Sequence, residues 1–152
     1  MKIFLAGIMQ GSLSTHAVHN QSYRRLVVEQ LRKYLPQAEI YDPWSDHQNS
    51  LDYDDDHARQ VFLYHNRLCG QVDLVLAYVP QASMGTAIEM WEAFRHGKLV
   101  VTVSPLEHNW SVKFLSDRVY PNWDAFFAEL AGGDFLRWFQ AARAAKAERA
   151  GS

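Results

Sequence analysis

The sequence has few of the features that mark secreted, membrane-spanning or nucleic-acid-binding proteins. It contains one cysteine, Cys69, which excludes an intramolecular disulfide. No apolar run approaches the ~18 residues that a transmembrane helix needs. Its 15 basic residues do not exceed its 17 acidic ones, and this mild acidity argues against a nucleic-acid partner. The apolar start is short and is interrupted by Gln10-Gly11-Ser12, unlike a signal peptide, so we expect a cytoplasmic protein.

The composition is that of one ordinary globular domain. The chain has 152 residues, of which 48% are hydrophobic, enough for a single core. No internal repeat or linker divides it, so we expect one domain over residues 1–152. Residues 134–152 begin with an apolar face and continue as a tail rich in Ala, Lys, Arg and Glu, which predicts a C-terminal helix with a fraying end.

The most informative stretch, residues 72–103, predicts a strand, a loop, a helix and a second strand. Leu74–Val79 and Leu99–Val103 are short apolar runs typical of buried strands, and a helix is expected to open at Thr86 and close at Gly97. Two buried strands joined by a helix form a parallel βαβ unit. Ligands of such sheets lie beyond the carboxyl ends of the strands, where residues 81–89 fall.

Glu89 is the main candidate for chemistry in this stretch. We expect it to point from the first helical turn toward the ligand crevice, next to Gly85, where the backbone allows close approach. The sequence Thr86-Ala87-Ile88-Glu89 is also a capping box, in which Glu89 satisfies only the amide of Thr86. Local sequence leaves both interpretations open.

The remaining pattern predicts three more strands and several helices. Residues 44–56 are polar and aperiodic, which is typical of a functional or mobile loop. The acidic run before His57 could suggest a metal site, but acids at a helix start complement its dipole, so we expect no metal. His16 and His19 lack acidic or cysteine partners at ligand spacing. The strands are expected at Lys2–Ala6, Glu39–Tyr41 and Arg118–Tyr120, and the helices at about 20–34, 58–69, 109–116, 123–131 and 134–150.

Three segments together resemble the nucleoside 2-deoxyribosyltransferase family, which includes related nucleoside monophosphate N-glycosidases. They are FLAG (4–7), SMGTAIEMWEAFRHGKLVV (83–101), and Asn109 with the pair Ser116-Asp117. The resemblance spans about residues 2–127. Each motif is weak alone, and their order and spacing make the set fairly specific. With the βαβ unit, it implies a flavodoxin-like α/β three-layer sandwich with roughly five parallel strands.

The resemblance implies that this chain exchanges the base of 2′-deoxynucleosides. Glu89 would attack C1′ and form a covalent deoxyribosyl-enzyme, and a helix N-terminus would keep its carboxylate ionised. His65 occupies the position of an aspartate that passes protons to and from the nucleobase. Histidine serves as a general acid near neutral pH without elaborate tuning, although helical spacing also allows a hydrogen-bonded core histidine. No cofactor is required.

The resemblance also implies a homodimer, or a dimer-based oligomer, with shared active sites. Asn109 matches an asparagine that reaches the neighbouring subunit's site, although its position also allows it to cap the following helix. The five Trp and eight Phe exceed what a small core demands, so some are expected at an interface or against a base. Contacts with the deoxynucleoside and the free nucleobase are expected at Gly7, Ile8, Ser83, Met84, Gly85 and Ser111.

Three departures from the family pattern keep other functions open, the first being His65 in place of the family's aspartate. Ile3 stands where several relatives place a tyrosine that steadies the nucleophile, and Ser83 is the residue found in the monophosphate glycosidases. The first alternative is therefore a 2′-deoxynucleoside 5′-monophosphate N-glycosidase, although the first loop lacks an arginine for the phosphate. The second alternative is a non-catalytic nucleotide-binding module in which Glu89 is only a cap.

Overall fold

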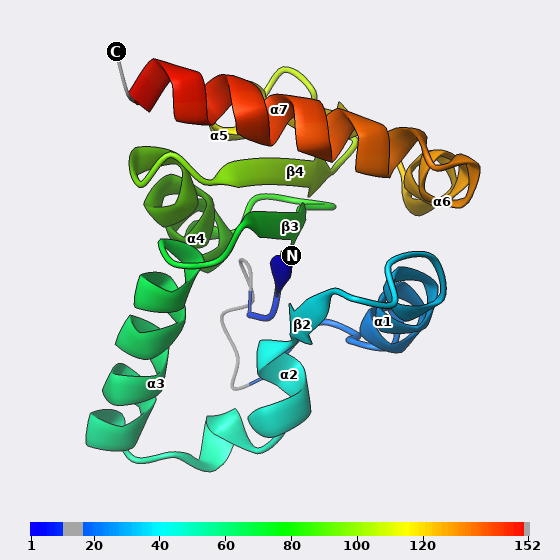
Figure 1. The fold of residues 1–152 in the computed structure, drawn as a ribbon. Helices are drawn as coiled ribbons and strands as arrows, with labels where there is room; N and C mark the ends of the chain where they lie inside the picture. The colour runs from blue at the N-terminus through cyan, green and yellow to red at the C-terminus, as the bar shows by residue number, and fades with distance from the viewer. Residues whose placement is uncertain (11–16, 151–152) are drawn as a thin grey trace.

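A five-stranded, all-parallel sheet forms the middle layer of the fold (Figure 1). The computed structural model describes residues 1–10 and 17–150, so His16 lies outside the described residues. The strand order is β2-β1-β3-β4-β5, so the predicted flavodoxin-like α/β class with about five strands is confirmed. The strands are β1 (Lys2–Gly7), β2 (Glu39–Tyr41), β3 (Leu74–Tyr78), β4 (Leu99–Val103) and β5 (Arg118–Tyr120).

Helices cover both faces of the sheet. α3 and α4 lie on one face, and α1 and α6 on the other, with α7 running alongside β4 (Figure 1). This arrangement buries both faces, as parallel sheets require. The helices are α1 (Tyr23–Tyr34), α2 (Pro43–Asp46), α3 (Asp55–Cys69), α4 (Met84–Arg95), α5 (Trp110–Leu115), α6 (Trp123–Gly132) and α7 (Asp134–Ala150), with a 3-10 turn at Ser50–Asp52.

The period of two in each strand divides the core into two clusters. In β1, Ile3 and Leu5 pack with α1, α6 and α7, whereas Phe4 and Ala6 pack on the side of α3 and α4. All four side chains are at most 1% exposed. The central strands are therefore packed on both faces. Because they are parallel, their carboxyl ends lie at the same edge of the sheet.

Sequence signals set most of the helix boundaries. Asp54 is the N-cap of α3, where its Oδ1 accepts the His57 amide at 2.8 Å. This confirms that the acidic run marks a helix start. The preceding stretch was expected to be aperiodic, but it contains α2, which begins after the N-cap Asp42 with Pro43 in its first turn.

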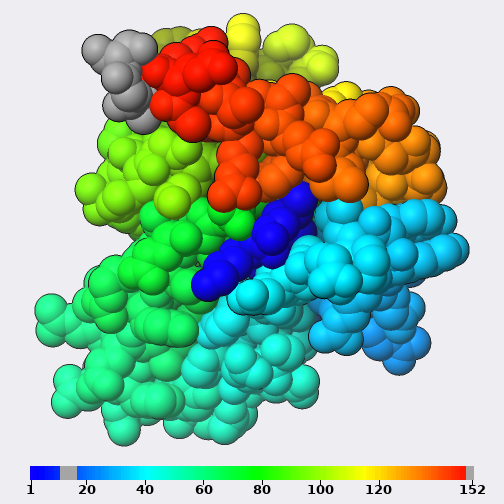
Figure 2. Space-filling view, viewed as in Figure 1, coloured from blue at the N-terminus to red at the C-terminus, as the bar shows by residue number. Residues whose placement is uncertain are grey.

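The C-terminal helix is tied to the sheet through its charged half. Lys146 donates to the Lys98 carbonyl and to Asp117, both at 2.7 Å, and Arg143 lies 3.4 Å from Asp73. The helix is thus held at least as far as residue 146, beyond the apolar half that sequence predicted to pack. Figure 2 shows the N-terminal residues (blue) at the surface between this helix (orange to red) and the segment around β2 (cyan). In the described part of the chain, no helix is long and apolar enough to span a membrane.

Candidate active site

The cavity that contains Glu89 lies where the strand order of the sheet reverses. β1 pairs with β2 on one side and with β3 on the other. After β1 the chain therefore forms β2 at one edge of the sheet and then crosses back over β1 to form β3. Open α/β sheets bind ligands at such a switch point, outside the carboxyl ends of the strands. Gly7 ends β1 and, together with Glu89 of α4 and His65 of α3, lines a cavity of about 440 Å³.

Glu89 lies in the second turn of α4 and does not cap the helix. The helix begins at Met84, because Ser83 is the N-cap and its hydroxyl accepts the Thr86 amide. Ser83 Oγ also lies 3.0 Å from Thr86 Oγ1. The capping-box interpretation and the expected first-turn position of Glu89 are therefore both wrong. Within residues 1–10 and 17–150, no hydrogen bond or ion pair occupies the Glu89 carboxylate.

Burial dominates the electrostatics of Glu89. Desolvation raises the pKa of this half-buried carboxyl from 4.5 to about 8, and the positive charge of Arg24 offsets the rise only in part. The expectation that the helix N-terminus keeps Glu89 ionised is therefore wrong below about pH 8. Removal from water costs a carboxylate more than the helix dipole returns. Carboxyl groups that titrate this far from their ordinary range are enriched at catalytic sites.

Arg24 is a buried side chain that holds α1 against the strands whose ends form this site. Its Nη1 donates to the Leu5 carbonyl at 2.9 Å and to Asp42 Oδ1 at 2.8 Å, and its Nη2 donates to the Gly7 carbonyl at 3.3 Å. These hydrogen bonds join α1 to the carboxyl ends of β1 and β2. A side chain at position 7 would collide with the Tyr23 hydroxyl, so the close approach of α1 requires glycine there.

His65 lines the cavity as a neutral imidazole. Its Nε2 lies 3.0 Å from the Tyr41 hydroxyl, and its ring packs edge-on against Phe4. Desolvation, followed by the positive charge of His47, lowers the pKa of His65 from 6.5 to about 4. The expectation that His65 titrates near neutral pH without tuning is therefore wrong. Its place in the cavity wall nevertheless keeps it available to a ligand.

A second cavity of about 280 Å³ adjoins the first. The two share Met9, Gln10, Phe62 and His65, so together they form one elongated cleft. The far wall includes His47 and the 3-10 turn that follows it. The sequence predicted a functional or mobile loop in this stretch but did not identify His47 or its neighbours as cavity residues. Their contacts with α3 arise only in the folded chain. The other lining residues are Val18, Pro43, Ser50, Leu51, Tyr53, Ala58 and Val61.

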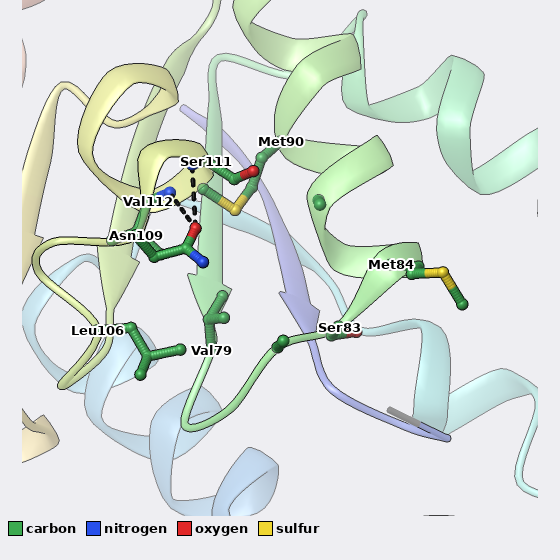
Figure 3. Close-up of a pocket in the computed structure, with 10 residues that line it drawn as sticks. Val79, Ser83, Met84, Met90, Leu106, Asn109, Ser111 and Val112 are labelled. Carbon is green, nitrogen blue, oxygen red and sulfur yellow. Dashed lines mark hydrogen bonds between the residues drawn. The ribbon is translucent and has the colours of Figure 1, made fainter. Parts of the chain in front are cut away.

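Asn109 lies on the other side of α4 from the Glu89 cleft. It is the N-cap of α5, where its Oδ1 accepts the amides of Ser111 at 3.0 Å and Val112 at 3.3 Å (Figure 3). This confirms the capping role that the sequence allowed. With Ser111 it lines another cavity of about 360 Å³, which includes Ala87 and Met90 of α4 and meets the Glu89 cavity at Ser83 and Met84. Within one chain, neither Asn109 nor Ser111 lines the cleft that contains Glu89.

The expected substrate contacts divide into three groups. Gly7, Ser83, Met84 and Gly85 line the Glu89 cleft as expected. Asn109 and Ser111 line the other cavity. Ile8 is only 2% exposed, and its backbone is hydrogen-bonded to Tyr78 and Gln21. It therefore belongs to the core and does not line the cleft. Among the described residues, no group of three or more His, Cys, Asp or Glu is placed to hold a metal ion.

An apolar surface crosses α4 and α5 beside these cavities. Trp110 is 77% exposed and Met84 is 80% exposed. Ile88 and Trp91 of α4 border a shallow groove with Trp110 of α5. An exposed apolar patch of this kind usually marks an interaction surface. We call it the α4–α5 face, and its exposed members are Met84, Ile88, Trp91, Phe94, Trp110 and Phe114.

The fold is shared with several solved structures at low sequence identity. A 2-deoxyribosyltransferase of Bacillus psychrosaccharolyticus is 19% identical, with a TM-score of 0.60 over 86% of this chain and 96% of that one. A conserved protein of Enterococcus faecalis V583 is also 19% identical, with a TM-score of 0.61 over 87% and 98%. A CMP N-glycosidase of Clostridium botulinum is 18% identical, with a TM-score of 0.50 over 86% and 98%. No protein-family model and no curated protein matches the sequence.

Proposed function

We propose that this protein is a nucleoside 2′-deoxyribosyltransferase that exchanges the base of 2′-deoxynucleosides through a covalent deoxyribosyl-Glu89 intermediate. The proposal rests on the position and environment of Glu89. It lies in a cleft at the switch point of the sheet, has no capping role, and is largely desolvated. The fold shared with a 2-deoxyribosyltransferase and a CMP N-glycosidase supports chemistry at an N-glycosidic bond.

The chemistry requires an ionised Glu89. Its Oε attacks C1′ while the electron pair of the C1′–N bond moves onto the leaving base, and the sugar is then ester-linked to Glu89. A second base, or water in a hydrolase, takes the sugar from this ester and restores the carboxylate. Positive charge that develops on the sugar favours the carboxylate, and Arg24 adds to this by lowering the pKa of Glu89. No cofactor enters either step.

The two adjoining cavities suit the two halves of a nucleoside. The cavity with Glu89, Gly7 and Gly85 would receive the deoxyribose, so that C1′ faces the nucleophile. The adjoining cavity, behind Phe62 and His65, would receive the base. Its apolar and aromatic walls provide a stacking surface, and its imidazoles provide hydrogen bonds to the base edge.

We propose further that the enzyme works as a homodimer or a dimer-based oligomer formed through the α4–α5 face. The amide of Asn109 would then reach the Glu89 cleft of the neighbouring copy, which Asn109 does not line within its own chain. Trp110 stands beside Asn109 and is a suitable interface anchor, because aromatic residues dominate interface energetics.

A base-exchange assay tests the proposed activity. The protein is incubated with deoxyinosine, with and without free adenine, and also with 2′-deoxynucleoside 5′-monophosphates. Exchange that depends on the second base identifies a transferase. Free base from the monophosphates alone identifies the hydrolase that the CMP N-glycosidase fold suggests. Binding without turnover of any substrate refutes an enzyme and leaves the nucleotide-binding module.

The Glu89→Ala variant tests the nucleophile in the same assay. Loss of a covalent nucleophile lowers kcat by on the order of 10³-fold or more. At pH 4.5 its melting temperature should stay close to that of the wild type, because Glu89 makes no capping bond and still holds its proton in the folded state. The matched control is Glu92→Ala, three residues along α4, which removes a carboxylate whose partners are Arg95 and His96. Near-normal turnover by Glu89→Ala would overturn the assignment.

A further inference from the structure

Two tyrosine–histidine pairs meet in the wall of the second cavity. The Tyr41 hydroxyl lies 3.0 Å from His65 Nε2, and the Tyr53 hydroxyl lies 2.9 Å from His47 Nδ1. The two imidazole rings are 5.1 Å apart, at 66° to one another. One pair comes from β2 and α3, and the other comes from the segment between α2 and α3. The fold thus places two hydrogen-bonded imidazoles side by side.

The environments of the two imidazoles differ. His65 is enclosed by the rings of Phe4, Tyr41 and Tyr64, and this burial is the main reason that its pKa is low. His47 is half-buried at the outer side of the same cavity. Because burial and then the charge of His47 lower the pKa of His65, His65 is the imidazole of the pair that stays neutral.

The charged groups around the pair come from three elements. Asp46 of α2 favours a proton on the pair, since its charge raises the pKa of His65. Arg24 of α1 opposes it, but Arg24 is ion-paired with Asp42 at 2.8 Å. His57 of α3 packs edge-on against Tyr53, with ring centroids 4.2 Å apart, and does not line the cavity. Among the described residues, Nε2 of His47 has no hydrogen-bond partner, so this nitrogen is open to a ligand in the cavity.

We propose that His47 donates the proton to the leaving nucleobase, with Tyr53 orienting it and His65 remaining neutral. The proposal rests on the proposed function, because it places the base in the second cavity. As Glu89 Oε bonds to C1′, the C1′–N bond breaks and its electron pair passes to the base nitrogen. That nitrogen takes the Nε2 proton of His47, whose Nδ1–H still donates to Tyr53. When a new base attacks C1′ and releases Glu89, its N–H proton returns to His47.

Substrates that differ only in the need for a proton test this step. 7-Methyl-2′-deoxyguanosine carries a cationic base that departs without protonation, whereas 2′-deoxyguanosine needs a proton. 5-Fluoro-2′-deoxyuridine and 2′-deoxyuridine make the matching pyrimidine pair, because fluorine stabilises the departing anion. General acids contribute about 10²- to 10⁴-fold. We expect His47→Ala to lower kcat at least about 10²-fold on the substrate that needs a proton, and less than about tenfold on its activated partner.

Two further variants separate proton donation from structure. Tyr53→Phe removes one hydroxyl and leaves the ring in place, so it should show the same dependence on leaving group with a smaller loss. If His47→Ala does not fold, Tyr53→Phe can take its place in the test. His57 contacts the same tyrosine, Tyr53, but lies outside the cavity. His57→Ala should therefore keep wild-type kcat on both substrates. Equal losses on both members of a pair, or a His57→Ala loss that matches His47→Ala, would overturn the proposal. If the wild type cleaves neither pair, as nucleosides or 5′-monophosphates, the proposed function fails and this step with it.

Discussion

At the scale of single residues, environment decides what each ionisable group can do. Glu89 and His65 line one cleft, and burial moves both toward their neutral forms, with pKa values of about 8 and about 4. The carboxyl group therefore holds its proton at neutral pH, and the imidazole lacks one. An enzyme that needs the Glu89 carboxylate must then gain activity as pH rises, which gives a direct test of the electrostatics.

We predict opposite effects of pH on activity and stability through Glu89. The kcat/KM of the wild type on 7-methyl-2′-deoxyguanosine, whose base departs without a proton, should rise with pH up to about 8, because only the ionised carboxylate attacks C1′. Between pH 4.5 and 8 the folded state holds the Glu89 proton that the unfolded state has released, so stability falls as pH rises. Glu89→Gln removes this dependence. Its melting temperature should match the wild type at pH 4.5 and exceed it by on the order of 5 °C at pH 9. Parallel melting curves at every pH would refute the raised pKa.

At the scale of elements, the caps of two helices determine which side chains reach the site. With Ser83 as its N-cap, α4 begins at Met84, two residues earlier than its sequence suggests, so Glu89 is not a capping residue. Asn109 begins α5 with its Oδ1, and the described residues leave its Nδ2 without a hydrogen bond. The oxygen of the Asn109 amide thus has the structural role of a cap, and its nitrogen is left for the proposed catalytic role.

The variants Asn109→Asp and Asn109→Ala should distinguish these roles. A carboxylate at position 109 still accepts the amides of Ser111 and Val112 and suits a helix N-terminus, so Asn109→Asp should keep wild-type stability. Asn109→Ala loses the cap, at a cost of about 1 kcal/mol in urea unfolding. Both variants lack the amide donor, and both should lose at least about tenfold in base exchange. Wild-type turnover by Asn109→Asp would mean that Asn109 is only a cap.

At the scale of the whole molecule, the α4–α5 face links the fold to the proposed assembly. The face lies on the helix that carries Glu89 and on the helix that Asn109 caps. A second copy that covers Trp110 would remove a largely exposed aromatic side chain from water. Dimerisation would thus shape the active site as well as bury apolar surface.

Mixing two inactive variants should restore activity if sites are shared. In a mixed dimer of Glu89→Ala and Asn109→Asp, one site carries both changes and the other carries neither. Random exchange makes half of the dimers mixed, so activity should recover to about a quarter of the wild-type value. Light scattering establishes the dimer, and a tagged subunit measures the exchange. Complete exchange without recovery would show that each chain builds its own site.

The sequence by itself determined the layers of this protein and the identity of its central carboxylate. The strands Glu39–Tyr41, Leu99–Val103 and Arg118–Tyr120 have the predicted bounds. The central one, Leu99–Val103, is a contiguous run of buried residues, as a strand covered on both faces needs. Glu89 followed from a motif whose residues lie within one βαβ unit. These features depend on neighbours in the chain, which a sequence displays directly.

Only the tertiary structure decided the chemistry that surrounds Glu89. The pKa of its carboxyl depends on burial at a cavity that residues of β1, α3 and α4 line together, and the contact between His47 and His65 joins two segments through their packing. The place of Asn109 across α4 from Glu89 depends on the direction in which each side chain leaves its helix. Desolvation and distance arise between segments that are far apart in the chain, so no local pattern of residues contains them.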